Sequence, residues 1–192
     1  SKGALLADEV GLGKTIEAGL ILSQKWAEWK RRILIITPSN LRKQWYQELT
    51  EKFFLPCAIL ESKSYNECTK KGDFKPFQKS EIVICSYQFA KTKAQDIKGI
   101  DWDLVVLDEA HRLRQRSNQE AASQNKSFHD INVKLFGDDD KEITQLDWVR
   151  KLSKHQVLLL DIDQTVRPGD LPRELTLRLV QEAKAQARFQ KL

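Results

Sequence analysis

Short apolar runs alternate along the chain with longer stretches in which apolar residues recur at helical spacing. Continuous runs rich in β-branched residues are typical of strands covered on both faces. Such runs predict strands at residues 4–7, 33–37, 58–60, 82–86, 104–108 and 157–161, and the stretches between them predict helices at about 15–29, 39–53, 143–152 and from 172 onward. This alternation predicts an α/β fold of the RecA-like, phosphate-loop kind, with a mainly parallel sheet between helical layers.

Two helices carry clear signals at an end or on a face. Pro38 marks a break before the second helix, and Ser39 is its predicted N-cap. In the last helix Leu175, Leu179 and Ala183 are expected to share one face.

Two less regular segments interrupt the alternation. Residues 62–80 are polar and contain a glycine and a proline, which predicts a loop. Residues 114–142 are polar and carry an acidic run at 138–140, which predicts an exposed insertion with partial helix. We therefore expect a single domain over residues 1–192 with one polar insertion.

Composition narrows the class of protein. The chain has 192 residues, of which 41% are hydrophobic and 31% charged, as in a globular domain with a full core. No apolar run approaches the length needed to span a membrane, and no secretory signal pattern opens the chain, so we expect no membrane partner. A net charge of +5 permits a polyanionic partner without establishing one.

The cysteines indicate a reducing compartment. Cys57, Cys68 and Cys85 are odd in number and not closely paired, which argues against a disulfide framework or a zinc ribbon. Cys85 lies in an apolar run and is predicted to be a buried thiol. We expect a cytoplasmic protein, of bacterial or phage-related type, or nuclear if eukaryotic. Since the chain contains no methionine, we expect a fragment of a longer protein.

A glycine-rich loop follows the first predicted strand and opens the first helix. Gly11 and Gly13 permit the torsions and close approach that a phosphate-binding backbone requires. Lys14 is placed to reach the β- and γ-phosphates, and the Thr15 hydroxyl to ligate Mg²⁺. A glycine turn that binds nothing is the alternative, but the strand–loop–helix setting favours binding of ATP.

A second motif ends the strand at 104–108. Asp108 is predicted to hold Mg²⁺, and Glu109 to orient or deprotonate an attacking water. His111 lies one turn further on and would link this site to another element. An ordinary acidic strand end is the alternative, and the preceding phosphate loop favours nucleotide hydrolysis.

These two motifs resemble motifs I and II of superfamily 2 helicases and translocases, the second being of the DEAH-box type. The general phosphate-loop pattern has glycine where this chain has Asp8, and an aspartate there resembles the Swi/Snf-type branch. Residues 35–45 and 82–87 are similar to motifs Ia and Ib of that branch. The resemblance implies the N-terminal RecA-like ATP-binding lobe of a nucleic-acid-stimulated ATPase. The nucleotide-binding residues are then Asp8, Gly11, Leu12, Gly13, Lys14, Thr15 and His111.

The resemblance also implies a nucleic-acid contact, with DNA expected more than RNA. Free N–H groups at a helix start suit a backbone phosphate, and Arg42 and Lys43 add positive charge there. The alternative is that both are a solvated helix face, and Trp45 is expected in the core. The predicted contact residues are Thr37, Ser39, Asn40 and Ser86.

The last strand runs into a segment that departs from the Swi/Snf pattern. Residues 160–168 look more like the Gly-Asp-x-x-Gln motif of superfamily 1 helicases, with Leu160 in place of glycine. The family role of that glutamine, to sense the γ-phosphate, maps onto Gln164. A plain exit from the strand is the alternative.

Two functions remain open from the sequence. The first is the ATP-hydrolysing lobe of a nucleic-acid-dependent helicase or translocase, nearly inactive without a second RecA-like lobe and its arginine finger. The second is a nucleotide-gated interaction module that binds ATP without moving along nucleic acid. The polar insertion and the unusual residues at 161–167 motivate the second reading.

Overall fold

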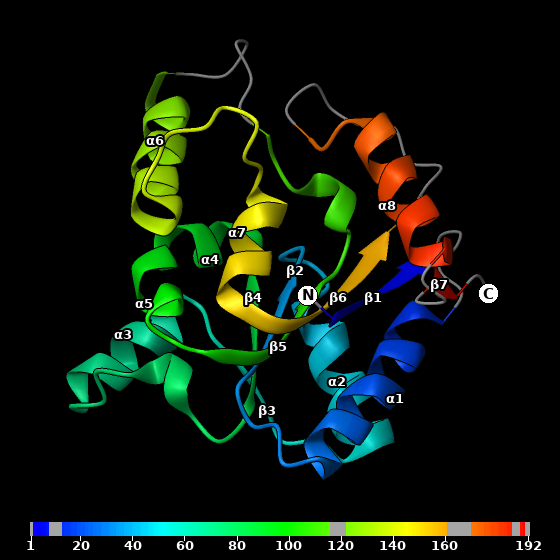
Figure 1. Cartoon of the computed structure of the whole chain (residues 1–192). Helices are drawn as coiled ribbons and strands as arrows, with labels where there is room; N and C mark the ends of the chain where they lie inside the picture. Colours follow the sequence, from blue (N-terminus) through cyan, green and yellow to red (C-terminus); the bar gives the residue numbers. More distant parts are fainter. Residues whose placement is uncertain (1, 8–12, 116–121, 161–169, 186–188, 191–192) are drawn as a thin grey trace.

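A seven-stranded sheet in the order β3-β4-β2-β5-β6-β1-β7 forms the centre of the molecule (Figure 1). The computed structural model describes residues 2–7, 13–115, 122–160, 170–185 and 189–190. All neighbouring strands pair in parallel, which confirms the predicted α/β fold. The strands are β1 Lys2–Ala7, β2 Ile33–Thr37, β3 Cys57–Ile59, β4 Ile82–Ser86, β5 Trp102–Leu107, β6 Ser153–Leu160 and β7 Phe189–Gln190.

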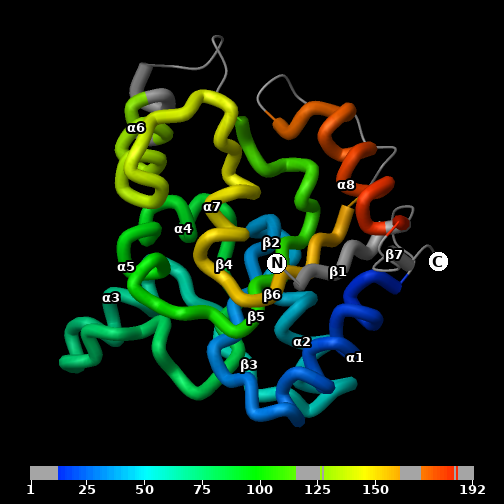
Figure 2. Tube along the Cα trace, viewed as in Figure 1, coloured from blue at the N-terminus to red at the C-terminus, as the bar shows by residue number. Residues whose placement is uncertain are grey.

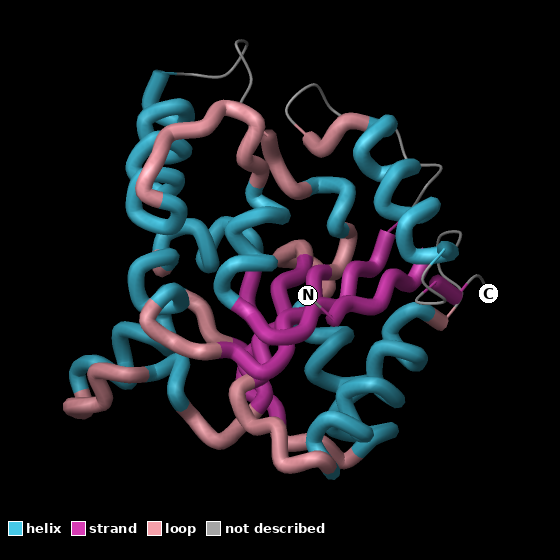
Figure 3. Tube along the Cα trace, viewed as in Figure 1, coloured by secondary structure: helices cyan, strands magenta, loops and turns pink. Residues whose placement is uncertain are grey.

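Helices cover both faces of this sheet (Figure 3). Side chains of β2 alternate between the faces: Ile33 and Ile35 pack towards α1 and α2, and Leu34 and Ile36 pack in the cluster that includes α4, α5, α7 and α8. The helices are α1 Lys14–Ala27, α2 Arg42–Phe53, α3 Ser62–Lys70, α4 Tyr87–Thr92, α5 Ala94–Lys98, α6 Ala122–Phe136, α7 Gln145–Leu152 and α8 Arg173–Ala185, with 3-10 turns η1 Pro76–Gln78 and η2 Ala110–Arg112.

The strand next to the phosphate loop lies between segments from the far end of the chain. β1 pairs with β6 on one side and with β7 on the other (Figure 1), and α8, orange to red in Figure 2, packs beside β1. The described helices include none that is long and apolar enough to cross a membrane.

Most predicted strands are confirmed, and β6 differs most in length. It begins at Ser153, ahead of its apolar part, where it pairs with Trp102 at the start of β5. Gln156 in this part is buried, and its amide donates to the carbonyl and hydroxyl of Ser153, both at 2.9 Å. Because this first part of β6 is polar, the pattern of apolar residues did not reveal it. In α8, Leu179 and Ala183 are buried as expected.

The prediction of a loop over residues 62–80 was wrong for residues 62–70 and 76–78, which form α3 and η1. The Glu61 side chain accepts from the backbone of Ser64, and the Ser64 hydroxyl accepts from the Glu61 backbone N–H at 2.9 Å, so a reciprocal capping box starts the helix. None of the side chains of α3 is fully buried, which explains why apolar periodicity did not reveal the helix.

The predicted N-cap of the second helix was also wrong. α2 begins at Arg42 with Leu41 as its N-cap, and Ser39 and Asn40 lie in the turn before it. The Leu41 N–H donates to the Pro38 carbonyl at 3.0 Å, and this bond closes the turn.

The insertion contains a longer helix than its composition suggested. α6 runs over 15 residues, and Phe128 packs against Trp148 of α7 with ring centroids 4.7 Å apart. Asn132 is fully buried and accepts a hydrogen bond from the Trp148 indole at 2.7 Å. The described part of the insertion is therefore anchored to the domain through Phe128 and Asn132.

Candidate functional site

The carboxyl ends of four neighbouring strands carry the predicted functional residues. Ser86 ends β4, Thr37 ends β2, Asp108 follows β5, and Leu160 ends β6. Thr37 and Ser86 are register partners, and the Asp108 N–H donates to the Ile36 carbonyl at 2.9 Å. This edge of a parallel sheet is where ligands bind in open α/β folds.

The start of α1 lies at the same edge. Gly13, the N-cap, has φ 84° and ψ 0°, a left-handed conformation that glycine adopts without steric cost. The Lys14 ammonium donates to the Leu160 carbonyl at 3.3 Å, which holds this side chain beside the end of β6. Thr15 follows in the first turn of the helix, whose N-terminus suits phosphate groups. Asp8, Gly11 and Leu12 lie outside the described residues.

Asp108 is held by four hydrogen bonds. Its Oδ2 accepts from the Thr37 hydroxyl at 2.7 Å and from the Trp45 indole at 2.8 Å. Its backbone N–H donates to Ile36, and its carbonyl accepts from the Tyr87 hydroxyl at 2.6 Å. Burial, followed by the charges of Asp108 and Glu109, raises the pKa of Tyr87 well above its ordinary value, so this hydroxyl keeps the proton that it donates.

The bonding around Asp108 fits a magnesium ligand. Both side-chain donors use Oδ2, and within the described ranges no hydrogen bond ends on Oδ1. Carboxylates that ligate metals are commonly oriented by hydrogen bonds to outer partners. Thr37 and Trp45 are neutral donors, so the negative charge of the carboxylate is retained. Magnesium ligation by Asp108 and Thr15 stays a prediction that these contacts favour.

Glu109 occupies a left-handed backbone conformation, with φ 56° and ψ 46°. For a residue with a side chain this costs on the order of 1 kcal/mol, and such strain is found most often at functional sites. Its Oε2 lies 3.0 Å from Arg112 Nε and 3.5 Å from His111 Nε2. The carboxylate is thus held beside two nitrogen-bearing side chains, one of which, His111, is buried. Sequence reasoning missed Arg112, although a Glu–Arg spacing of three was visible.

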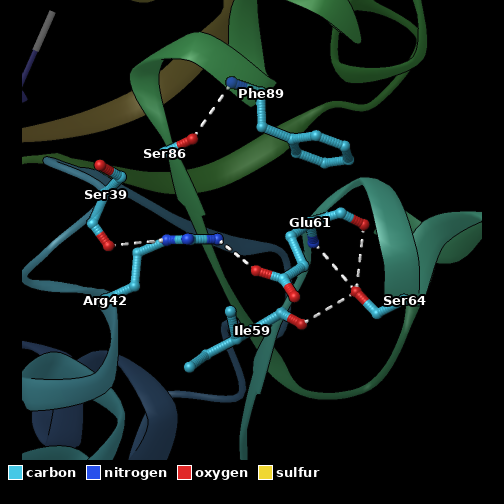
Figure 4. A network of polar contacts seen from close by, with 7 residues as sticks. All are labelled: Ser39, Arg42, Ile59, Glu61, Ser64, Ser86 and Phe89. Atoms are coloured by element: carbon cyan, nitrogen blue, oxygen red, sulfur yellow. Dashed lines mark hydrogen bonds and ion pairs between the residues drawn. The ribbon is translucent and has the colours of Figure 1, made fainter.

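Two residues assigned to nucleic acid make their side-chain contacts inside the fold. Thr37 is fully buried and donates to Asp108. Ser86 is 7% exposed, and its hydroxyl accepts from the Phe89 N–H at 3.2 Å as the N-cap of α4 (Figure 4). The hydroxyls of both residues are therefore occupied inside the fold, and the assignment of Thr37 and Ser86 to nucleic acid stays a prediction. Ser39 and Asn40 are exposed in the turn, and their assignment stays a prediction.

Arg42 does not belong to a solvated helix face. It donates from Nε to the Ser39 carbonyl at 3.1 Å and from a terminal nitrogen to Glu61 Oε2 at 2.9 Å (Figure 4). Its side chain is only 19% exposed, whereas Lys43 is exposed. Arg42 therefore fastens the 38–41 turn to the start of α3.

Trp45 is buried as expected, with 1% of its surface exposed. Its contact with Asp108 was not predicted. A buried indole N–H needs an acceptor, so the sequence indicated that Trp45 would donate a hydrogen bond. The sequence does not say which acceptor it finds, because Trp45 and Asp108 meet only after α2 has packed on the sheet. Gln164 lies outside the described residues.

Comparison with known proteins places this site in a family. A profile of the SNF2-related domain matches residues 1–133. The SWI2/SNF2 ATPase core of Sulfolobus solfataricus in complex with dsDNA has a similar fold, with a TM-score of 0.56 and 23% sequence identity over 83% of this chain and 28% of that chain. The SWI2/SNF2 ATPase core domain of the same organism gives a TM-score of 0.51 and 21% identity over 83% of this chain and 27% of that one.

The chain thus spans little more than a quarter of the length of these solved structures. The family match covers the phosphate-loop segment, β2, the 38–41 turn and the Asp108–Glu109 pair, and it stops before the segment that contains Gln164. Because the match extends over more than half of the sequence, the chain belongs to the SNF2-related domain family.

Proposed function

We propose that this chain is the ATP-binding and ATP-hydrolysing lobe of a nucleic-acid-dependent translocase or helicase, with DNA as its track. The observation that carries this proposal is the placement of Lys14 and of the Asp108–Glu109 pair at the ends of adjacent strands, β6 and β5. A triphosphate at the start of α1 would lie beside both.

Each residue has a distinct part in this proposal. Lys14 exchanges its bond to the Leu160 carbonyl for the β- and γ-phosphate oxygens of ATP. Asp108 and Thr15 are the residues that would hold Mg²⁺, which neutralises charge on the phosphates when bound. Glu109 orients the attacking water and accepts its proton, which requires its contact with Arg112 to loosen.

The exposed turn at 38–41 is the proposed contact with nucleic acid. Ser39 and Asn40 lie on its surface, at the same sheet edge as Asp108. A net charge of +5 favours a polyanion, and one of the similar solved structures is a complex with dsDNA. We therefore propose a duplex backbone phosphate at this turn.

Full turnover on this proposal needs a second RecA-like lobe. In this class of ATPase a partner lobe supplies the arginine that stabilises charge on the transferring phosphate, which contributes roughly 10³–10⁵ in rate. The solved structures of similar fold are more than three times as long as their aligned part, which leaves room for such a lobe in the natural protein.

Glu109→Gln tests the catalytic assignment in the natural full-length protein. The variant should bind ATP normally and hydrolyse it at least about 100-fold more slowly, because the amide cannot accept a proton. Fluorescent-nucleotide binding and phosphate release measure the two properties. Glu142→Gln is the matched control, because Glu142 is exposed and lies beyond η2. An unimpaired rate in Glu109→Gln would refute the role of Glu109.

Stimulation by nucleic acid separates the two candidate functions. The translocase proposal expects duplex DNA to raise ATP turnover of the wild-type protein above its basal rate. If neither DNA nor RNA changes the rate while ATP binding persists, the nucleotide-gated interaction module becomes the better description.

A further inference from the structure

Thr37 and Trp45 connect the proposed nucleic-acid turn directly to the proposed magnesium ligand. We propose that they are positioning residues that make the orientation of the Asp108 carboxylate depend on the state of the 38–41 turn. The inference rests on the proposed function, because it joins the nucleic-acid contact to the ATP site within a single lobe.

The two donors lie on either side of the turn and meet at one atom. Thr37 is the last residue of β2 and directly precedes the turn. Trp45 lies in the first turn of α2, the helix that directly follows the 38–41 turn. Both donate to Asp108 Oδ2, at 2.7 and 2.8 Å. A displacement of the turn relative to β5 must therefore be accommodated by the same carboxylate oxygen.

The connection through the turn is short and hydrogen-bonded throughout. The Leu41 N–H donates to Pro38, and the Trp45 N–H donates to the Leu41 carbonyl, both at 3.0 Å. Arg42 holds the outer side of the turn through Ser39 and Glu61. Trp45 is 1% exposed, so its ring moves with α2 and has little room to adjust independently.

Rotation of the Asp108 carboxylate would change the affinity for Mg²⁺ more than the affinity for the nucleotide. Oδ2 is occupied by the two donors, so they determine where Oδ1 points. Loss of an outer hydrogen-bond partner typically weakens metal affinity by about 10- to 100-fold. The expected effect of losing either donor is therefore a rise in the Mg²⁺ concentration required for turnover.

Four variants of the natural full-length protein test the positioning role. Thr37→Val removes the hydroxyl donor at nearly constant volume, and Thr37→Ser restores it. Trp45→Phe removes the indole donor, and Trp102→Phe is its matched control. Trp102 is equally buried, at 1% exposure, but its indole donates to the Ile97 carbonyl at 3.0 Å, away from Asp108.

The first measurements are Mg²⁺ affinity, by calorimetry on the protein saturated with a non-hydrolysable ATP analogue, and ATP turnover against free Mg²⁺ at saturating ATP. Thr37→Val and Trp45→Phe should each require about tenfold more Mg²⁺ for half-maximal turnover. Thr37→Ser and Trp102→Phe should remain near wild type. Thermal unfolding of all four variants identifies any loss of rate that comes from misfolding. If the folded Thr37→Val and Trp45→Phe proteins show a wild-type Mg²⁺ dependence, or if Trp102→Phe shows the same shift, the positioning role is refuted.

The second measurement is the ratio of turnover with and without duplex DNA, at Mg²⁺ concentrations saturating for each variant. The coupling predicts that this ratio falls in Thr37→Val and Trp45→Phe and is retained in Trp102→Phe. An unchanged ratio in all variants refutes the coupling. If nucleic acid fails to stimulate the wild-type protein, the proposed function fails instead, and the Mg²⁺ measurement still decides the positioning role.

Discussion

Asp108 and Glu109 are neighbours in the chain, but the fold surrounds their carboxylates with different chemistry. Asp108 is bound by two neutral donors, Thr37 and Trp45, which fix its direction and leave its charge for a cation. Glu109 is instead paired with Arg112, close to His111. The contacts of Asp108 suit a metal ligand, whereas Glu109 can take a proton on the proposed mechanism only when its pairing with Arg112 loosens.

At the scale of single residues, the cysteines should differ sharply in reactivity. Burial raises the pKa of the Cys57 and Cys85 thiols to about 12, whereas Cys68 is partly exposed, with its sulfur 3.4 Å from the Lys79 ammonium. At pH 8 in the native protein, the two buried thiols should react on the order of a thousandfold more slowly than an ordinary thiol of pKa about 8.5.

Alkylation followed by peptide mass mapping checks this expectation, and denatured protein is the control. The same shifts predict that stability falls as pH rises above about 8.5, because the unfolded chain loses thiol protons before the folded one does. Equal labelling of all three cysteines in native protein would contradict the burial of Cys57 and Cys85.

At the scale of elements, a hydrogen bond to the buried Asn132 side chain holds α6 and α7 together. The Trp148 indole donates to Asn132, whose amide donates to the Asp140 carbonyl at 2.9 Å. The contact links the helix to the acidic turn that follows it. This hydrogen bond attaches the insertion to the domain, and the composition of the insertion did not predict it.

Trp148→Phe should therefore destabilise the protein by about 1–3 kcal/mol, because it leaves a buried amide oxygen of Asn132 without its donor. Urea unfolding measures the loss. Trp29→Phe is the matched control, since Trp29 is 80% exposed, and a change within about 0.5 kcal/mol is expected there. Equal effects of the two substitutions would show that the contact contributes little.

The elements also show which parts of the structure were predictable. β2 and β4 were predicted at their observed ends because their residues are buried throughout and apolar except for the last one of each strand. α3 was missed because its signal is a capping box, with few apolar residues. Asp108 was identifiable from its motif, whereas the contacts from Thr37 and Trp45 arise from the register of β2 with β5 and from the packing of α2.

At the scale of the whole molecule, the proposed site is assembled along one edge of the sheet, and the proposed function needs an arginine from a second lobe to complete it. We expect the 192-residue chain on its own to bind ATP and ADP but to hydrolyse ATP about 10³–10⁵ times more slowly than the complete enzyme. Single-turnover hydrolysis at saturating protein measures this rate. Brisk turnover by the chain alone would mean that the missing charge is supplied internally or by self-association.

The position of β1 has a consequence for synthesis of the protein on the ribosome. Lys2 to Ala7 pair with His155 to Leu160 on one side, and β7 flanks the other side. The strand that leads into the phosphate loop therefore emerges before β6 and has no partner until β6 has been made, roughly ten to thirty seconds later at ordinary elongation rates. A nascent chain that ends before β6 lacks the strand that pairs with β1, so we expect it to bind nucleotide only after β6 has been made.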